Sequence, residues 1–179
     1  MANNHERRIQ LAPEEQHMGT GDLPPGRKLV KCKWLFKTKF VSNGSPLKYK
    51  AIFVEKGYSQ LHGIDYNETF ALVANMDSIR LALAIAASGK WEVHHMDVKC
   101  SFINGDITED IYMQKLEGFV SNPSLVCRLK KSLYGLKQAP RAWYAKIDGF
   151  LLSLSFIRWN YYPNLYFKLI HCYLMIIFL

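Results

Sequence analysis

An Asn-Gly pair at positions 43 and 44 lies between two segments that alternate lysine with apolar residues, and it constrains the fold of this 179-residue chain most strongly. Asn-Gly is the strongest short-range signal for a β-hairpin, because both residues tolerate the backbone angles of a tight turn. The flanking segments, 30–41 and 47–57, have the alternation of β-strands. The sequence therefore predicts a two-stranded basic hairpin.

The rest of the chain mixes helices and strands without βαβ regularity, so we expect an α+β fold. A helix is predicted over 78–88, capped by Asp77 or Ser78. Because this helix is apolar on nearly every side, we expect it to be buried. Pro140 has the position of a first-turn proline, so a second helix is expected from there to about Leu154. Further strands are predicted at 91–98, 111–113 and 126–129.

The two ends of the chain differ in character. Residues 1–25 are polar, with glycine and proline near their end, and they predict a flexible leader without the apolar core of a signal peptide. The apolar segment after Lys168 is 11 residues long. About 20 residues are needed to cross a bilayer. We therefore expect a buried strand or a damaged end there, no membrane partner, and an intracellular protein, either cytoplasmic or nuclear.

The formal net charge of +8 is distributed unevenly. Residues 27–56 hold nine bases and one acid, 128–146 hold six bases and no acid, and 92–117 are acidic. Two basic segments around an acidic centre suit a phosphate-binding cleft with metal-binding carboxylates. On charge alone, solvated faces of an ordinary basic domain explain the pattern equally well.

Asp97 is the first candidate for metal chemistry, because it lies near the end of a predicted strand. Magnesium prefers carboxylate and phosphate oxygens as ligands. Taken alone, an aspartate at a strand end is more often a turn or cap residue. The four cysteines are far apart and have no metal-ligand spacing.

Several motifs, in a fixed order, resemble one family. They read KWLFKTKF at 33–40, KGYSQLHGIDYNETFA at 56–71, SIRLALAIAA at 78–87, MDVKCSFINGDITEDIYM at 96–113, EGF at 117–119 and VCRLKKSLYGLKQAPRAWYAKID at 126–148. Over about residues 30–165, the chain closely resembles the reverse transcriptase domain of copia-type long-terminal-repeat retrotransposons. The last motif is long and distinctive.

The resemblance implies a fingers-and-palm polymerase fold, with fingers at about 26–75 and part of a palm at about 76–179. Asp97 then corresponds to the first catalytic aspartate and binds magnesium together with the carbonyl of Val98. Phe102 corresponds to the aromatic residue under the nucleotide sugar; without the family, a core aromatic is as good an interpretation. The implied partners are an RNA template, a DNA primer and a deoxynucleoside triphosphate.

The resemblance also assigns Tyr134, Gly135 and Lys137 to a loop that shapes the nucleotide and template pocket. Lys50 in the fingers is the candidate for the γ-phosphate, because a cation there can neutralise its charge. For Lys50 and Lys137 alike, an ordinary solvated lysine is the competing interpretation.

Some family features are missing from this sequence. The family has a second aspartate motif, Tyr-Val-Asp-Asp, shortly after the region of residues 165–167, and this sequence has no acid after Asp148. A family arginine of the fingers is replaced by Ile52. We therefore expect an incomplete palm sheet, a fragment of a polyprotein reverse transcriptase, and no polymerase activity from this chain alone. The alternatives are a basic nucleic-acid-binding remnant and a pseudogene product that folds poorly.

Overall fold

The computed structural model describes residues 18–114 and 126–179. In these residues, two α-helices and eight strands form an α+β arrangement, so the predicted class is confirmed. The strands make three small antiparallel sheets. The EGF motif at 117–119 lies outside the described residues.

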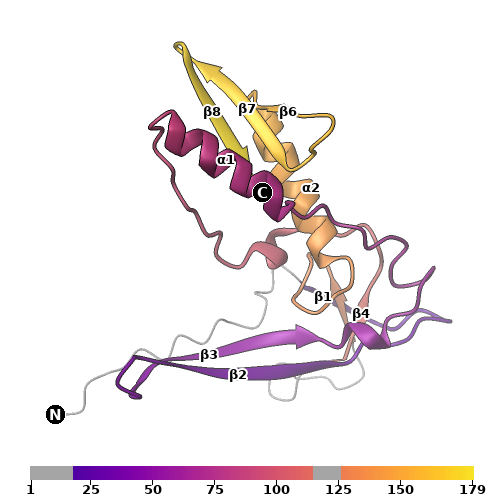
Figure 1. The fold of residues 1–179 in the computed structure, drawn as a ribbon. Helices are drawn as coiled ribbons and strands as arrows, with labels where there is room; N and C mark the ends of the chain where they lie inside the picture. The colour runs from indigo at the N-terminus through magenta and orange to yellow at the C-terminus, as the bar shows by residue number, and fades with distance from the viewer. Residues whose placement is uncertain (1–17, 115–125) are drawn as a thin grey trace.

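The predicted basic hairpin is present as β2 (Cys32–Phe40) and β3 (Pro46–Glu55). It projects from the rest of the molecule as a long arm (Figure 1). The chain reverses at Val41–Gly44, where Gly44 adopts a φ of 81° and its N–H donates to the Val41 carbonyl. The glycine of the Asn-Gly pair therefore supplies the left-handed conformation that the turn needs.

A second sheet has the order β1-β5-β4. It consists of β1 (Met18–Gly21), β5 (Val126–Leu129) and β4 (Tyr112–Met113). The last two strands confirm the sequence predictions. The leader predicted for residues 1–25 lies outside the described residues up to residue 17, and the structure corrects its end: residues 18–21 pair with β5. Hydrogen bonds to a neighbouring strand gave this polar, glycine-containing segment a structure that its composition did not predict.

The main core lies where the base of the hairpin, the second sheet and the start of α2 (Ala139–Ser153) meet. Pro140 lies in the first turn of α2, as predicted. The buried members of this core are Val30, Phe53, Ile111, Met113, Cys127, Leu129, Leu133, Leu136 and Ala139.

The apolar C-terminal segment forms a hairpin instead of the expected buried strand. β7 (Leu165–Ile170) pairs with β8 (Tyr173–Phe178), and β6 (Ile157–Arg158) lies on the other side of β7. His171 and Cys172, with φ angles of 44° and 69°, form the two-residue turn. Most of β8 is exposed, because β7 is its only partner strand among the described residues.

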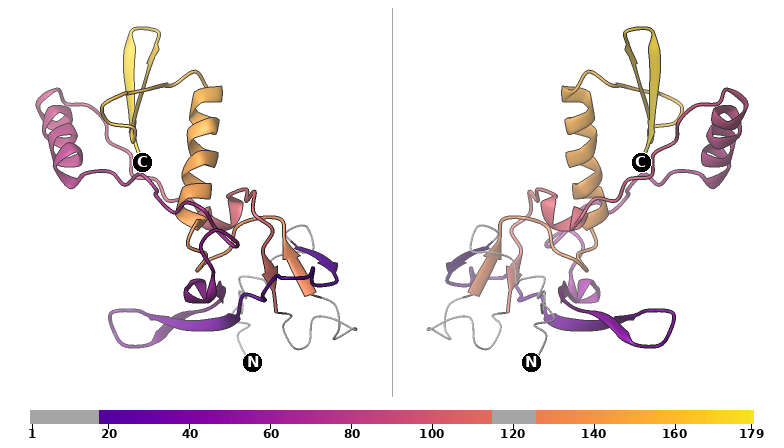
Figure 2. Two further views of the ribbon diagram at one scale, coloured as in Figure 1. Left: turned by 90° about the vertical axis from the view of Figure 1, so that its right-hand side faces the viewer. Right: turned by 90° about the vertical axis from the view of Figure 1, so that its left-hand side faces the viewer.

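Two further expectations were wrong. The apolar helix is present as α1 (Met76–Ser88), but its N-cap is Asn75 and Ala86 is its only buried residue. It lies on the opposite side of the β7–β8 hairpin from α2 (Figure 2). Residues 91–98 form no strand. Both errors have one cause: an apolar pattern predicts burial or strand pairing only when another element is placed to supply the partner.

Across the described ranges, no helix combines the length and apolarity needed to cross a membrane.

A polar network ties the C-terminal hairpin to α2. The hydroxyl of the fully buried Tyr166 donates to Asp148 Oδ1 at 2.6 Å and lies 3.2 Å from the Tyr144 hydroxyl. Arg158 donates to the other oxygen of Asp148 at 3.0 Å. Burial, followed by the hydrogen bonds to Asp148 and Tyr144, raises the pKa of Tyr166, so its hydroxyl stays protonated and remains a donor.

Removal of this hydroxyl in Tyr166→Phe is expected to lower the free energy of unfolding by about 1.5–3 kcal/mol, the usual loss for a buried hydrogen bond to a charged group. Urea unfolding followed by circular dichroism measures the change. Tyr161→Phe is the matched control, because Tyr161 is 86% exposed and should be neutral. Equal stabilities of the two variants would contradict the role given to the network.

Candidate active site around Asp97 and the 134–138 loop

The 134–138 loop connects the end of the second sheet to α2 and packs directly against the base of the β2–β3 hairpin. The Glu55 N–H donates to the Tyr134 carbonyl at 2.8 Å. Gly135 has a φ of 93°, and a Cβ placed on it would lie 2.0 Å from the Glu55 carbonyl oxygen. On the other side, a Cβ on Gly57, in the 3-10 turn η2 (Gly57–Ser59), would lie 2.2 Å from the Gly135 carbonyl oxygen. Two glycines therefore allow a backbone-to-backbone contact that no larger residue permits.

Two buried glutamines fix the loop on its other side. Gln60 Nε2 donates to Gln138 Oε1 at 3.0 Å, and Gln60 Oε1 accepts from the Lys137 N–H at 2.8 Å. Gln138 Nε2 donates to the carbonyl of the buried Asp65 at 2.9 Å. Sequence reasoning did not single out these residues, although both lie inside the quoted motifs. A buried side-chain amide in such a position makes hydrogen bonds to backbone N–H and carbonyl groups that would otherwise lack partners.

Two of the predicted site residues meet beside this loop. The rings of Phe102 and Tyr134 lie edge to face, with centroids 5.6 Å apart. Phe102 belongs to the 3-10 turn η3 (Ser101–Asn104), which begins after Cys100 in a left-handed conformation. Burial raises the pKa of Tyr134, and the Cys100 thiol and then the Asp97 carboxylate add to the rise. Asp97 is therefore near enough to this pair for its charge to act on Tyr134.

Lys137 and Lys50 lie differently from each other. The Lys137 ammonium donates to the Tyr66 hydroxyl at 2.9 Å and lies 4.7 Å from the centre of that ring. Lys50 lies in the outer half of the hairpin, opposite Lys37. At about 3.3 Å per residue, it is roughly 17 Å along β3 from the contact with the loop. Lys137, which belongs to the loop, is thus held against Tyr66, whereas Lys50 lies apart from the loop.

Asp97 and Val98 lie in the exposed segment 91–98. The Asp97 carboxylate and a backbone carbonyl are oxygen donors of the kind that magnesium prefers. In residues 18–114 and 126–179, no three His, Cys, Asp or Glu residues are grouped as a metal site would need. The donors therefore suit magnesium in type, and further ligands are needed to complete its coordination.

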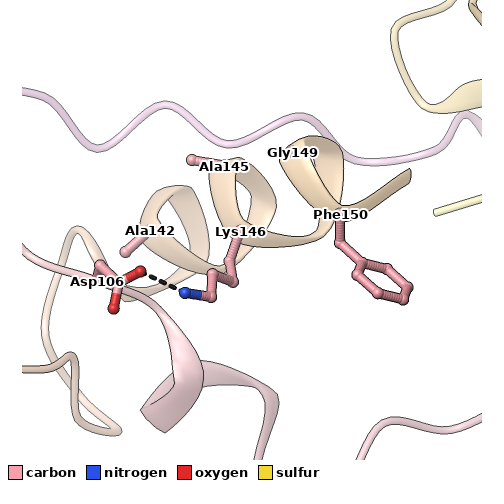
Figure 3. A pocket seen from close by; sticks show the side chains of 6 residues that line it. All are labelled: Asp106, Ala142, Ala145, Lys146, Gly149 and Phe150. Carbon is pink, nitrogen blue, oxygen red and sulfur yellow. Dashed lines mark hydrogen bonds and ion pairs between the residues drawn. The ribbon is translucent and has the colours of Figure 1, made fainter. Parts of the chain in front are cut away.

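A shallow pocket runs along α2, separate from these residues. It is lined by Asp106, Ala142, Ala145, Lys146, Gly149 and Phe150 (Figure 3). Lys146 forms an ion pair with Asp106 at 2.6 Å. Asp110 is likewise paired with Arg128. Both acids thus form surface ion pairs.

The buried carboxylate of Glu55 is a feature that sequence reasoning missed. Glu55 is 2% exposed, and neither of its carboxylate oxygens has a hydrogen-bond partner in the described part of the chain. Burial, and secondarily the charge of Asp65, raises the pKa of Glu55 to about 8. No sequence signal marked it, because a lone glutamate at a strand end usually faces solvent.

Known proteins resemble this chain over most of its length. A family model described as reverse transcriptase (RNA-dependent DNA polymerase) matches residues 18–179. The retrovirus-related Pol polyprotein from transposon TNT 1-94 of Nicotiana tabacum is 47% identical over 149 residues, which is 82% of this chain and 11% of that protein. The corresponding polyprotein from transposon RE2 of Arabidopsis thaliana is 46% identical over 136 residues, 75% of this chain and 9% of that protein.

The chain thus spans about a tenth of the length of these relatives. No solved structure matches it. The match covers every element described above and includes β1, which lies outside the motifs quoted from the sequence. The family model and the relatives from retrotransposons confirm the resemblance found in the motifs. The chain therefore belongs to the reverse transcriptase (RNA-dependent DNA polymerase) family.

Proposed function

We propose that this chain is the fingers and part of the palm of a retrotransposon RNA-directed DNA polymerase, with fingers at about 26–75 and palm at about 76–179. One observation carries the proposal. Phe102 from one motif and Tyr134 from another, far apart in the sequence, pack edge to face beside the base of the hairpin, and the charge of Asp97 adds to the rise in the pKa of Tyr134. An active site of this kind needs its carboxylate, its sugar-packing aromatic residue and its nucleotide loop within reach of a single nucleotide.

Each site residue then has a proposed role. Asp97 and the Val98 carbonyl would hold magnesium, which when bound would supply activation of the primer hydroxyl and neutralisation of the triphosphate charge. Phe102 packs under the sugar of the incoming nucleotide. Tyr134 supports the ring of Phe102, while Gly135 lets the loop approach the fingers closely.

The two lysines act on phosphate in this proposal. Lys137, which donates to the Tyr66 hydroxyl at the loop, contributes its positive charge to the proposed nucleotide and template pocket. Lys50 lies in the outer half of the hairpin, apart from the loop, so it reaches the γ-phosphate only when the fingers close over the triphosphate. The partners are an RNA template, a DNA primer, a deoxynucleoside triphosphate and the remaining parts of a polyprotein, in the cytoplasm or the nucleus.

We also propose that the 179-residue chain does not extend primers by itself. Two magnesium ions bound to a triphosphate need several carboxylate ligands, and Asp97 is the one that the family motifs assign here. The purified chain, given a primed RNA template with magnesium or manganese, is expected to show no extension above the Asp97→Asn variant. Extension that depends on Asp97 would disprove this incompetence.

A second candidate function is a basic remnant that binds nucleic acid without catalysis. It is favoured by the lysines of the hairpin, which make no ion pairs with the other described residues. A third is a product that folds poorly, favoured by the exposed apolar residues of α1, of 91–98 and of β8. A cooperative melting transition of the purified chain would count against the third candidate.

A further inference from the structure

The C-terminal sheet has an open edge at β8, which has β7 on one side and no strand on the other among the described residues (Figure 1). An edge strand presents backbone N–H and C=O groups that can pair with another chain. Proteins usually block such edges with lysine, proline, β-bulges or very short strands. β8 is six residues long, reads Tyr-Leu-Met-Ile-Ile-Phe, and contains neither a charge nor a proline.

The other sheet edges in residues 18–114 and 126–179 are blocked in these ways. In the basic hairpin, lysines occur along both strands, and the pairing of β2 with β3 is irregular near the turn. β4 and β6 are two residues long, and β1 is a four-residue strand with two glycines. In the described structure, β8 is therefore the edge that stays open to a further strand.

The hydrogen-bond pattern of the β7–β8 ladder determines which residues face the open edge. In an antiparallel pair, every second residue exchanges both backbone hydrogen bonds with the residue opposite. The Leu179 N–H donates to the Asn164 carbonyl at 3.0 Å, so Ile177, Met175 and Tyr173 are the β8 residues turned towards β7. The residues whose backbone groups point to the open edge, which we call the outward-facing residues, are Leu174, Ile176 and Phe178.

We propose that β8 pairs antiparallel with β8 of a second copy of this chain, about a two-fold axis that passes through the Ile176 pair. In this register Ile176 lies opposite its own copy, and Leu174 of each copy lies opposite Phe178 of the other. All the outward-facing residues then form hydrogen bonds, because each opposed pair exchanges two. A two-fold axis at Leu174 would instead place Ile176 opposite Cys172 in the turn and pair fewer of these groups.

The sequence of β8 is complementary to itself in this register. Every opposed side chain is apolar, so no charge meets a like charge across the axis. Pairing also covers Leu174 and Ile176, which are 50% and 38% exposed. The far edge of the sheet is β6, which is too short to continue the pairing. The contact is therefore isologous and closes at two copies.

The dimer is expected to be weak and reversible, because two six-residue strands bury less than the roughly 1,200 Å² at which standard interfaces begin. Sedimentation velocity of the purified 179-residue chain should show a monomer that converts to a dimer as the concentration rises through the micromolar range. A chain that stays monomeric at every concentration would overturn the proposal and leave this edge to a different polypeptide. Larger assemblies without a populated dimer would overturn the two-fold arrangement.

Ile176→Lys tests the position of the axis. The introduced ammonium group would lie directly opposite its own copy, so the Kd of the dimer should rise at least roughly tenfold. The matched control is Leu169→Lys on the middle strand β7, because Leu169 is 70% exposed and lies on the same face of the sheet as Ile176. The Kd of that variant should stay near that of the unmodified chain. Equal rises in both variants would overturn β8 as the interface.

Mixing of charged variants distinguishes a broken interface from a misfolded chain. Ile176→Glu should weaken the dimer as Ile176→Lys does, for the same reason. An equimolar mixture of the two variants should dimerise again, because opposite charges then lie directly opposite each other. The same two substitutions at Leu169 should show no preference for the mixed dimer. Failure of the Ile176 mixture to dimerise would overturn the register centred on Ile176.

Amide hydrogen exchange of the unmodified chain tests the backbone pairing without any substitution. A rise in chain concentration should slow exchange at the outward-facing residues and leave the β8 residues turned towards β7 unchanged, because those amides already have partners. Equal slowing at all six residues of β8 would indicate side-chain aggregation and overturn the pairing. None of these measurements uses polymerase activity, so their failure would leave the proposed function standing.

Discussion

Gly135→Ala is expected to lower the free energy of unfolding by roughly 2–5 kcal/mol, more than the same substitution at any other glycine in the described part of the chain. A left-handed backbone costs an L-residue about 1–2 kcal/mol, and overpacking adds about 1–3 kcal/mol. The new Cβ would lie 2.0 Å from the Glu55 carbonyl oxygen and 2.7 Å from Val54 Cγ1. Since the first of these atoms is backbone, no side-chain rotation relieves the contact. The loop or the hairpin must move.

The matched control is Gly149→Ala in α2, where an added Cβ meets nothing within 4 Å. Alanine in a helix is favoured over glycine by about 0.5–1 kcal/mol, so this variant should be slightly more stable. Denaturant unfolding of the two variants beside the unmodified chain gives the comparison. If Gly135→Ala proved as stable as Gly149→Ala, the close packing of the 134–138 loop on the hairpin would be wrong.

The second large effect is expected at Glu55, whose carboxyl group is buried without hydrogen-bond partners in the described structure. The pKa of Glu55 in the folded chain is raised to about 8, mainly by burial. In the unfolded chain it returns to an ordinary value near 4.3. The folded state therefore binds this proton more tightly, and ionisation of Glu55 opposes folding.

The sign of the pH dependence follows from these two values. The stability contributed by the proton is fully present below about pH 4.3, falls as the pH rises, and is lost above about pH 8. The charged group that acts on Glu55 is Asp65, and Cys32 lies opposite Glu55 in the ladder. Asp65 adds to the rise, while Cys32, opposite Glu55 in the ladder, has a pKa raised to about 11 and stays neutral through this range.

Glu55→Gln should remove this dependence, because a neutral amide of similar size replaces the ionisable group. At pH 9 the variant is expected to be more stable than the unmodified chain by up to about 5 kcal/mol, and at pH 5 the two should agree within about 1 kcal/mol. Melting temperatures measured from pH 5 to pH 9 give both comparisons.

Glu92→Gln is the control for this substitution, because the Glu92 side chain is 92% exposed. The pH profile of that variant should follow that of the unmodified chain between pH 5 and pH 9. If the stability of Glu55→Gln changed with pH in the same way as that of the unmodified chain, Glu55 would not be buried as the structure shows.

Some of the fold was predictable because it depends on short-range chemistry. The turn at Gly44 needs a residue that adopts a positive φ, and the strands beside it need alternation, so the hairpin was readable from neighbouring residues. Pro140 in the first turn of α2 is predictable for the same reason. The exposure of α1 and the lack of a strand at 91–98 were not predictable, because both depend on where other elements lie.

The candidate site divides in the same way. Asp97, Phe102 and Tyr134 were identified because they lie in motifs whose amino-acid sequence is specific to a family. The contact between Phe102 and Tyr134 was not visible in the sequence, nor was the role of Gln60 and Gln138 in holding the loop. An amide looks alike in a sequence whether it is solvated or buried, and only its partners decide which it is.

By itself, then, the sequence determined the hairpin, the second helix, the α+β class and the family. Turn chemistry, periodicity and sequence motifs are signals carried by a few neighbouring residues. Only the tertiary structure decided that Glu55 is buried and unpartnered, that Gly135 touches the backbone of β3, and that α1 stays exposed. The physical reason is that burial and close packing are properties of pairs of segments far apart in the chain, and no local pattern encodes the position of the second segment.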